Sequence, residues 1–268
     1  MDDPRIEKAR YQYYVCKSNA LVREARYSLS LLTQRLISYI CMLIKPGKYS
    51  NDQMKQEFEL ADFYHTMGLK RISSTAYANA RNALNSLLVA PLWLPEREQP
   101  ITWLSSCDIT EDNHVTVVLH KDLGGHLLDL MSDYTRYNLA DISDINSAYG
   151  LRLYEYFRSY LHAPTHSVTV KLETLRKMLM IDEQSAYQQY SAFNQRVLKK
   201  AIDEINKNSD IKVEYFKDSK RNKVKVEKLH FCIASEDFSS EPKKVHKLQF
   251  GRTSLDSSAE SKEDDLPF

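Results

Sequence analysis

The sequence predicts an α+β fold that is mainly helical and consists of two successive units of the same kind, followed by a disordered acidic tail. Only 6 of the 268 residues are glycine, which argues against a loop-rich all-β fold or a mononucleotide-binding fold. Apolar residues recur at three- and four-residue spacing in several segments, as they do in amphipathic helices. The order helix, helix-turn-helix, hairpin occurs twice along the chain.

The first unit begins with a helix over residues 31–44, which ends before the breaker pair Pro46-Gly47. A short amphipathic stretch over 60–67 ends at Gly68, and Ser73 or Ser74 can cap a second helix that runs to about Leu88. Two short helices joined across a glycine form a helix-turn-helix pattern. Short strands are expected after it, at 93–95, 101–104 and 115–119.

The second unit repeats this order after a further helix over 123–131. Its expected elements are a helix over 145–161, a strand over 167–171, a short helix over 172–179, a long helix over about 187–206, and strands over 211–216 and 224–233 joined by a basic tip. Helix, helix-turn-helix and hairpin is the order of a winged helix. We therefore predict two tandem winged-helix domains, 1–134 and 135–235, with a tail over 236–268.

The formal net charge of +1 is the sum of two regions of opposite sign. Residues 236–268 hold 8 acidic and 5 basic residues, a net of −3, which leaves +4 on residues 1–235. Residues 188–235 alone carry 11 basic and 6 acidic residues. The tail has few apolar residues, so it cannot offset the entropy of ordering, and we expect it to be disordered up to its last few residues.

No segment resembles a membrane span or a secretion signal. The longest apolar stretch, residues 36–44, has 9 residues, whereas a bilayer span takes about 20. The N-terminus, Met1 to Arg5, lacks the apolar core of a signal peptide. The four cysteines are far apart in the sequence, and no two of them form a Cys-x-x-Cys pair. This spacing fits neither a zinc site nor a disulfide framework, so we expect reduced thiols and a cytosolic protein.

One face of the long helix in the second unit has the chemistry of a DNA-reading surface. Amides and cations on a helix can contact base edges and phosphates in the major groove, and basic residues on the hairpin tip can contact neighbouring phosphates. By composition alone, a solvated helix face is the more common explanation. The predicted DNA-binding residues of this domain are Gln188, Gln195, Arg196, Lys199, Lys217, Lys220, Arg221 and Lys223.

The counterparts in the first unit are Lys70 and Arg71 in the turn and Arg81 on the second helix. The charge density there is lower. We expect the first domain to contribute less to affinity or to serve mainly in dimerisation.

The sequence contains neither a Gly-x-x-x-x-Gly-Lys-Ser/Thr loop nor a Gly-x-Gly-x-x-Gly motif, so it indicates no ATPase or dinucleotide site. A rolling-circle nickase needs closely paired metal-binding histidines near a nucleophilic tyrosine. His162 and His166 are the nearest pair, but Pro164 between them breaks the helical geometry. We therefore expect no enzymatic activity, no catalytic residue, no metal and no cofactor.

An ordered series of short segments between Asn19 and Ile233 resembles the Rep_3 family of plasmid replication initiators, whose RepE- and Pi-like members bind iterons. The segments are Asn19–Ala25, Leu31–Ile37, Tyr149–Glu155, Phe193–Leu198, Ala201 with Glu204–Asn206, Ser209–Ile211 and Phe231–Ile233. One departure is Arg221-Asn222, where the family often has Gly-Arg. The resemblance implies two winged-helix domains that bind directly repeated origin DNA. It also implies a monomer that opens the origin and a dimer that represses its own gene.

The last five residues, Asp264, Asp265, Leu266, Pro267 and Phe268, resemble the acidic tip of bacterial single-stranded DNA-binding proteins. A terminal phenylalanine and its carboxylate can enter an apolar pocket rimmed by basic residues. An incidental solvated terminus is the alternative. The implied partners are host replication proteins: the initiator DnaA, the replicative helicase and proteins that read the single-strand binder's tail.

The leading hypothesis is thus a plasmid replication initiator in a monomer–dimer equilibrium. Two alternatives share parts of the evidence. A sequence-specific winged-helix transcriptional repressor would use the same DNA-binding surface, and a nicking enzyme would need the histidine pair.

Overall fold

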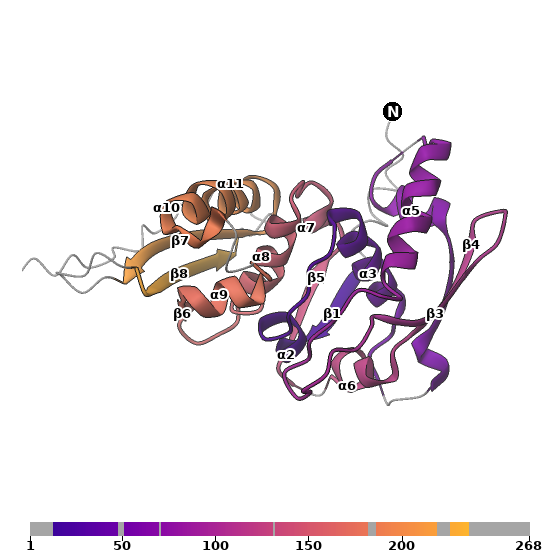
Figure 1. Cartoon of the computed structure of the whole chain (residues 1–268), viewed down its shortest axis with the longest axis horizontal. Coiled ribbons are helices and arrows are strands. Elements are labelled where there is room, and N and C mark those ends of the chain that lie inside the picture. The colour runs from indigo at the N-terminus through magenta and orange to yellow at the C-terminus, as the bar shows by residue number, and fades with distance from the viewer. Residues whose placement is uncertain are drawn as a thin grey trace, which may run out of the picture. The chain divides into compact units, whose positions relative to one another are not determined.

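The computed structural model describes residues 13–47, 51–69, 71–130, 132–181, 186–218 and 226–235. Within these ranges, two three-stranded antiparallel sheets each carry helices, and a two-stranded ribbon accompanies them (Figure 1). Lys70, Lys220, Arg221, Lys223 and the C-terminal tip 264–268 lie outside the described residues.

The first winged-helix domain uses capped helices and a sheet in the order β2-β4-β3. Ser30 accepts a hydrogen bond from the backbone of Thr33, and Ser73 accepts one from the backbone of Ala76, each at 3.1 Å. Such caps satisfy amide groups that have no partner inside the helix. The elements are α3 (Leu31–Leu43), β2 (Lys55–Glu59), α4 (Leu60–Thr66), α5 (Ser74–Ser86), β3 (Leu104–Ile109) and β4 (His114–Leu119).

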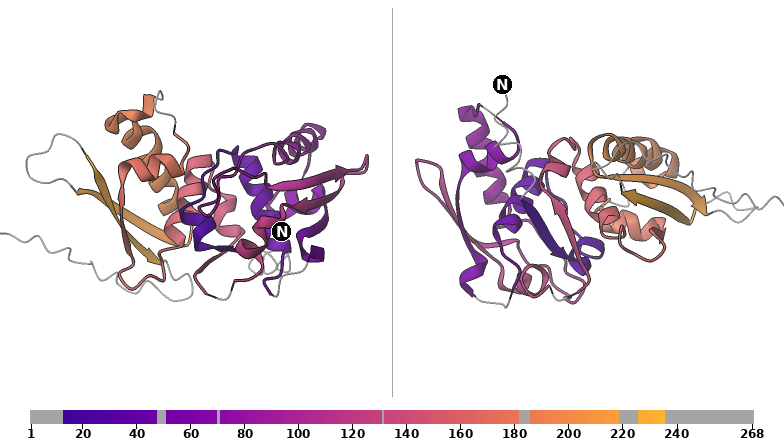
Figure 2. Two further views of the ribbon diagram at one scale, coloured as in Figure 1. Left: turned by 60° about the horizontal axis from the view of Figure 1, so that its bottom comes forward. Right: turned by 180° about the vertical axis from the view of Figure 1, so that it is seen from behind.

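The second domain repeats this topology, with a sheet in the order β6-β8-β7. Helices α10 and α11 lie over one face of that sheet (Figures 1 and 2). Its elements are β6 (Ser167–Lys171), α9 (Leu172–Met178), α10 (Tyr190–Phe193), α11 (Lys199–Asn208), β7 (Ile211–Asp218) and β8 (Lys228–Ser235), and α8 (Ala148–Arg158) precedes them. The prediction of two tandem winged-helix domains is confirmed.

Two details of the first domain differ from the prediction. The strand expected at 101–104 instead begins at Leu104, and Leu92, Trp93 and Ile101 form only isolated bridges. The helix expected over 123–131 is limited to the 3₁₀ turn Lys121–Leu123 and α6 (Gly124–Leu127). Two consecutive glycines at its start have poor helix propensity, which weighs against a longer helix.

Several elements were not predicted because their sequences lack a simple periodicity. They are β1 (Tyr14–Ser18), α2 (Asn19–Arg23), β2, β5 (Tyr134–Asn138), α7 (Ala140–Ser143) and the 3₁₀ turn Asn51–Met54. Strands β1 and β5 pair antiparallel, with Cys16 opposite Arg136. This ribbon joins two segments that lie more than a hundred residues apart in the sequence.

The ribbon is joined to α3 and α8 by a buried ion pair. The Lys17 ammonium group on β1 lies 2.6 Å from Glu155 Oε1 on α8, and the two side chains are 2% and 1% exposed. The Tyr137 hydroxyl on β5 donates to the same oxygen at 2.5 Å and lies 3.1 Å from the hydroxyl of Ser38 on α3. Strands β1 and β5 thus bind the carboxylate of α8 directly, and Ser38 of α3 bonds to both of its partners.

Both partners of this pair are ionised. Burial opposes ionisation of Glu155, but the nearby cations of Lys17 and Arg152 outweigh it and hold the pKa of the Glu155 carboxyl below its ordinary value. Burial also disfavours the charged form of Lys17, but the Glu155 carboxylate, together with Tyr137, Cys41 and Tyr27, raises the pKa of Lys17 well above its usual value. Removing either partner would leave the other as an unpaired buried charge, which would destabilise the folded protein.

Replacing Lys17 with methionine therefore leaves the Glu155 carboxylate buried without its closest cation. We expect Lys17→Met to lower the free energy of unfolding by about 3–5 kcal/mol, measured by urea denaturation. The double variant Lys17→Met/Glu155→Gln should recover part of this loss. The exposed pair Lys177–Glu173 on α9 supplies the control, and Lys177→Met should change stability by less than about 1 kcal/mol. Equal losses in the two Lys→Met variants would contradict the assignment.

The half-buried carboxyl of Asp141 in α7 has a raised pKa, in contrast to that of Glu155. Its Oδ2 accepts a hydrogen bond from the Asn138 backbone at 3.1 Å. Burial and the neighbouring Asp210 carboxylate raise the pKa of Asp141 to about 6, and the hydrogen bond from the Asn138 backbone, Arg158 and Tyr154 oppose the shift. The folded protein therefore binds a proton here at a pH at which the unfolded chain does not.

Because the folded pKa lies above the unfolded one, Asp141 contributes stability that grows as the pH falls through about 6. We expect the difference in unfolding free energy between the wild type and Asp141→Asn to shift in favour of the wild type between pH 7 and pH 5, measured by denaturation at each pH. The exposed Asp112→Asn should keep the wild-type pH slope. A pH-independent difference between the wild type and Asp141→Asn would contradict the raised pKa.

Candidate nucleic-acid interface

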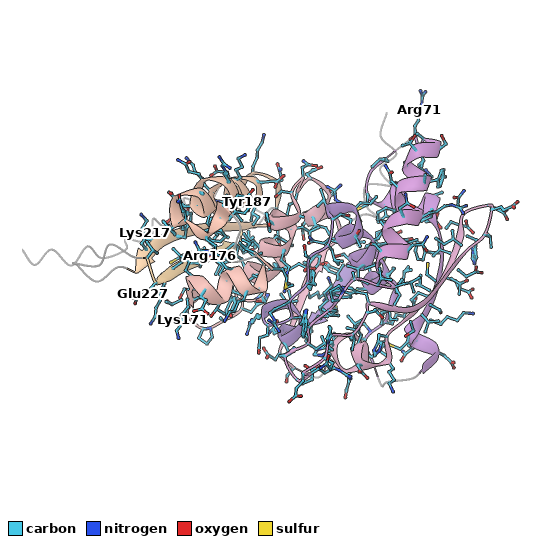
Figure 3. All side chains as sticks on the ribbon, viewed as in Figure 1. Arg71, Lys171, Arg176, Tyr187, Lys217 and Glu227 are labelled. Atoms are coloured by element: carbon cyan, nitrogen blue, oxygen red, sulfur yellow. The ribbon has the colours of Figure 1, made fainter. Side chains whose placement is uncertain are left out.

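The helix-turn-helix of the second domain places a long helix after α9. The Arg176 guanidinium on α9 donates from Nη2 to the carbonyl of Gln188 at 2.6 Å, and its carbon lies 5.3 Å from the centre of the Phe193 ring. These contacts connect the first helix of the motif to the start of the second (Figure 3). Sequence reasoning did not single out Arg176, because its partners are a backbone carbonyl and a buried ring.

The long helix runs from Tyr190 to Asn208 and has a π-helical turn over Asn194–Leu198. The backbone N–H of Lys199 donates to the carbonyl of Asn194, five residues earlier. This wider turn brings residues five apart onto neighbouring positions, so Phe193 and Leu198 are both buried. Such turns occur frequently at functional sites.

The two faces of this helix are arranged as the helical projection predicts. Phe193, Val197, Ala201 and Ile205 are buried, whereas Gln195, Arg196 and Lys199 are exposed. Gln188 precedes the helix and is half-buried, with its carbonyl bound by Arg176. The exposed amide and cations therefore lie on the solvent side of a helix whose other side is packed into the core.

The wing lies beside the start of this helix. Lys217 on β7 places its ammonium group 4.8 Å from the centre of the Tyr190 ring, and Figure 3 shows Lys217 near the end of that strand. The other predicted wing residues, Lys220, Arg221 and Lys223, lie outside the described residues. Lys217 thus joins the wing to the helix that it accompanies.

In the first domain, α4 and α5 form the corresponding helix-turn-helix. Gly68 has a φ of 86°, a conformation that glycine adopts without strain at the end of a helix. Arg71 is exposed and extends away from the start of α5 (Figure 3). Lys70 lies outside the described residues.

Arg81 on α5 has a role that its position in the sequence did not suggest. Its Nη2 donates to the carbonyls of Thr110 at 2.7 Å and Glu111 at 3.1 Å, and the same guanidinium also bonds to Asn113 Oδ1. These three residues form the turn between β3 and β4. Arg81 therefore holds the first wing against α5, and a contact with DNA stays a prediction.

The histidine pair considered for a nickase has no metal-site geometry. Nδ1 of His166 donates to the carbonyl of Leu161 at 2.5 Å. Across the part of the chain that the structure describes, no three histidine, cysteine or acidic side chains gather as a metal site would require. Nor does any helix within those ranges have the length and apolarity to cross a membrane.

Comparison with known proteins decides the family. The model of the first winged-helix domain of the initiator replication proteins matches residues 14–158, and that of their second winged-helix domain matches residues 171–233. The chain belongs to the initiator replication protein family. The two matches together cover most of the described residues, so this replication initiator carries both DNA-binding winged-helix domains of its family.

A solved structure has the same fold. The crystal structure of the Pi initiator protein in complex with iteron DNA is 17% identical in sequence, with a TM-score of 0.68, and the match covers 82% of this chain and 96% of that chain. At this level of identity the likeness establishes the fold of the initiator.

Proposed function

We propose that this initiator binds directly repeated sequences, iterons, at a plasmid origin in the cytosol, helps to open the origin and recruits host replication proteins. The long helix Tyr190–Asn208, the second helix of the helix-turn-helix in the second domain, is called the second recognition helix below. The observation that carries the proposal is the exposed face of this helix, with Gln195, Arg196 and Lys199, in a chain with both initiator domains. The solved relative of the same fold is described as bound to iteron DNA, which supports the choice of DNA.

Two tandem reading modules favour a repeat of about two helical turns, or roughly 20 base pairs. The second domain has the denser basic charge in its sequence, and Lys217 lies beside the helix. Gln188, Lys220, Arg221 and Lys223 belong to the same proposed surface, together with Lys70 and Arg71 of the first domain. We assign the main sequence reading to the second domain, and a smaller share of affinity or a role in dimerisation to the first.

Opening of the origin is proposed to use binding energy and DNA deformation. The sequence contains neither a Gly-x-x-x-x-Gly-Lys-Ser/Thr loop nor a Gly-x-Gly-x-x-Gly motif. Deforming a duplex has a sequence-dependent energy that contacts with the protein can offset. We accordingly propose a binding protein that performs no enzymatic step.

We further propose that a dimer of this chain represses the initiator's own gene. A repressor without an initiator role would use the same helices, and membership of the initiator family favours replication. A plasmid maintenance assay that depends on the origin separates the two functions, because only an initiator sustains the plasmid.

The DNA-binding surface can be tested by removing one cation. Arg196→Ala should lower the affinity for a direct-repeat duplex about tenfold or more if it reads a base, measured by fluorescence anisotropy at several salt concentrations. Lys121→Ala removes the same charge from a 3₁₀ turn of the first domain and should leave binding within twofold. Equal affinities of the wild type for repeated and scrambled DNA would contradict the proposal.

The C-terminal tip Asp264, Asp265, Leu266, Pro267 and Phe268 is proposed to bind host proteins that normally read the tail of the single-stranded DNA-binding protein. The support is the sequence itself, an acidic pair followed by an apolar residue, proline and a terminal phenylalanine. DnaA and the replicative helicase are further proposed partners of the initiator.

Deleting Leu266 to Phe268 should leave DNA binding unchanged and reduce recovery of these proteins in a pull-down, because the apolar side chain that enters the partner's pocket is lost. Replacing the same three residues with Ser-Ser-Ser keeps the chain length and should have the same effect. Full recovery of the partners by both variants would overturn the assignment.

A further inference from the structure

An asparagine at the start of the second recognition helix is held by two tyrosines. Oδ1 of Asn194 lies 3.1 Å from the hydroxyl of Tyr190, one turn earlier in the same helix, and 2.8 Å from the hydroxyl of Tyr215 on β7. Both hydroxyls donate to the same amide oxygen. The three side chains thus connect the recognition helix to the wing strand.

The two tyrosines are protonated donors at neutral pH. Burial raises the pKa of Tyr190 and of Tyr215 above the ordinary value of a phenol, and nearby ionisable groups add to the shift. An amide oxygen has two lone pairs and can accept both bonds. The orientation of the Asn194 amide is therefore set, with its oxygen toward the tyrosines and its NH₂ group on the other side.

The NH₂ group has hydrogen-bonding capacity that the described part of the protein does not use. Within the described ranges, no hydrogen bond from Asn194 Nδ2 occurs, and the side chain is only half-buried. The next two residues, Gln195 and Arg196, are exposed. The π-helical turn begins at Asn194 itself, which places this side chain at the local irregularity of the helix.

We propose that Asn194 contacts DNA directly by donating from Nδ2 to an acceptor on the repeated duplex, and that Tyr190 and Tyr215 are positioning residues for it. This inference rests on the proposed function. The acceptor is a base-edge atom, such as guanine O6, purine N7 or thymine O4, or a phosphate oxygen. Because the amide oxygen is already engaged, the two-bond contact that asparagine often makes with adenine is excluded.

A mutant cycle separates the proposed DNA contact of Asn194 from the positioning role of Tyr190 and Tyr215. Asn194→Ala should lower the affinity for the direct-repeat duplex about tenfold, since one donor is lost. Tyr190→Phe/Tyr215→Phe should lower it several-fold, because the amide is free to rotate. Combined with Asn194→Ala, the two tyrosine changes should cause no additional loss, as expected for groups that act through one residue. Binding is measured by fluorescence anisotropy with repeated and scrambled duplexes.

A base-edge acceptor and a phosphate acceptor predict different effects of Asn194→Ala on the affinities for the repeated and the scrambled duplex. If Asn194 binds a base, the affinity for the repeated duplex falls and the affinity for the scrambled duplex is unchanged. If it binds a phosphate, both affinities fall by a similar factor. Either result supports the contact.

Tyr134→Phe removes a hydroxyl from an exposed tyrosine of the first domain and should leave binding within twofold. A cooperative thermal unfolding transition, measured for each variant, serves as the control that the variant is folded. The inference is overturned if the wild type prefers repeated DNA but Asn194→Ala binds it within twofold of the wild type, or if the tyrosine changes cause a full additional loss in the Asn194→Ala background. A wild type without preference for repeated DNA would instead overturn the proposed function.

Discussion

The buried ion pair between Lys17 and Glu155 is the interaction on which the described fold depends most. It joins β1 and β5 to the Glu155 carboxylate of α8, and Ser38 of α3 bonds to Lys17 and Tyr137. Since α8 also packs against α11 of the second domain, the carboxylate is coupled to the scaffold of the recognition helix. At Gly150 a Cβ atom would meet the side chains of Ser147 and Glu204 at 2.5 and 2.7 Å, so a larger residue there would displace the contact between α8 and Glu204 of α11.

The two domains share a topology but hold their wings in different ways. In the first domain, the guanidinium of Arg81 binds three residues of the turn between β3 and β4. In the second, Tyr215 and Lys217 reach from β7 to the recognition helix at Asn194 and Tyr190. In the first domain the Arg81 guanidinium is bound to the protein's own turn, whereas in the second the cations Arg196 and Lys199 and the Gln195 amide are exposed. This difference agrees with a larger role of the second domain in reading DNA.

The small net charge of the chain is compatible with a DNA-binding protein because charge acts locally. The body carries +4 and the tail −3, and electrostatic interactions between exposed groups are screened beyond about 10 Å at moderate salt. A basic recognition surface and an acidic terminal segment can therefore serve different partners in one chain. A near-neutral total argues against a nucleic-acid partner only when the charge is evenly distributed.

The sequence by itself determined the two winged-helix units, the buried and exposed faces of the long helix and the resemblance to initiators. These features depend on local periodicity and on residue types near one another in the chain. Only the tertiary structure decided the pairing of β1 with β5, the partner of Lys17, the engagement of Arg81 in a wing and the contact of Tyr215 with Asn194. Each of these joins residues distant in sequence, and a lysine in a strand or an arginine on a helix carries no local sign of such a partner. Burial and hydrogen bonding assign these side chains their roles, and both arise only when the segments meet.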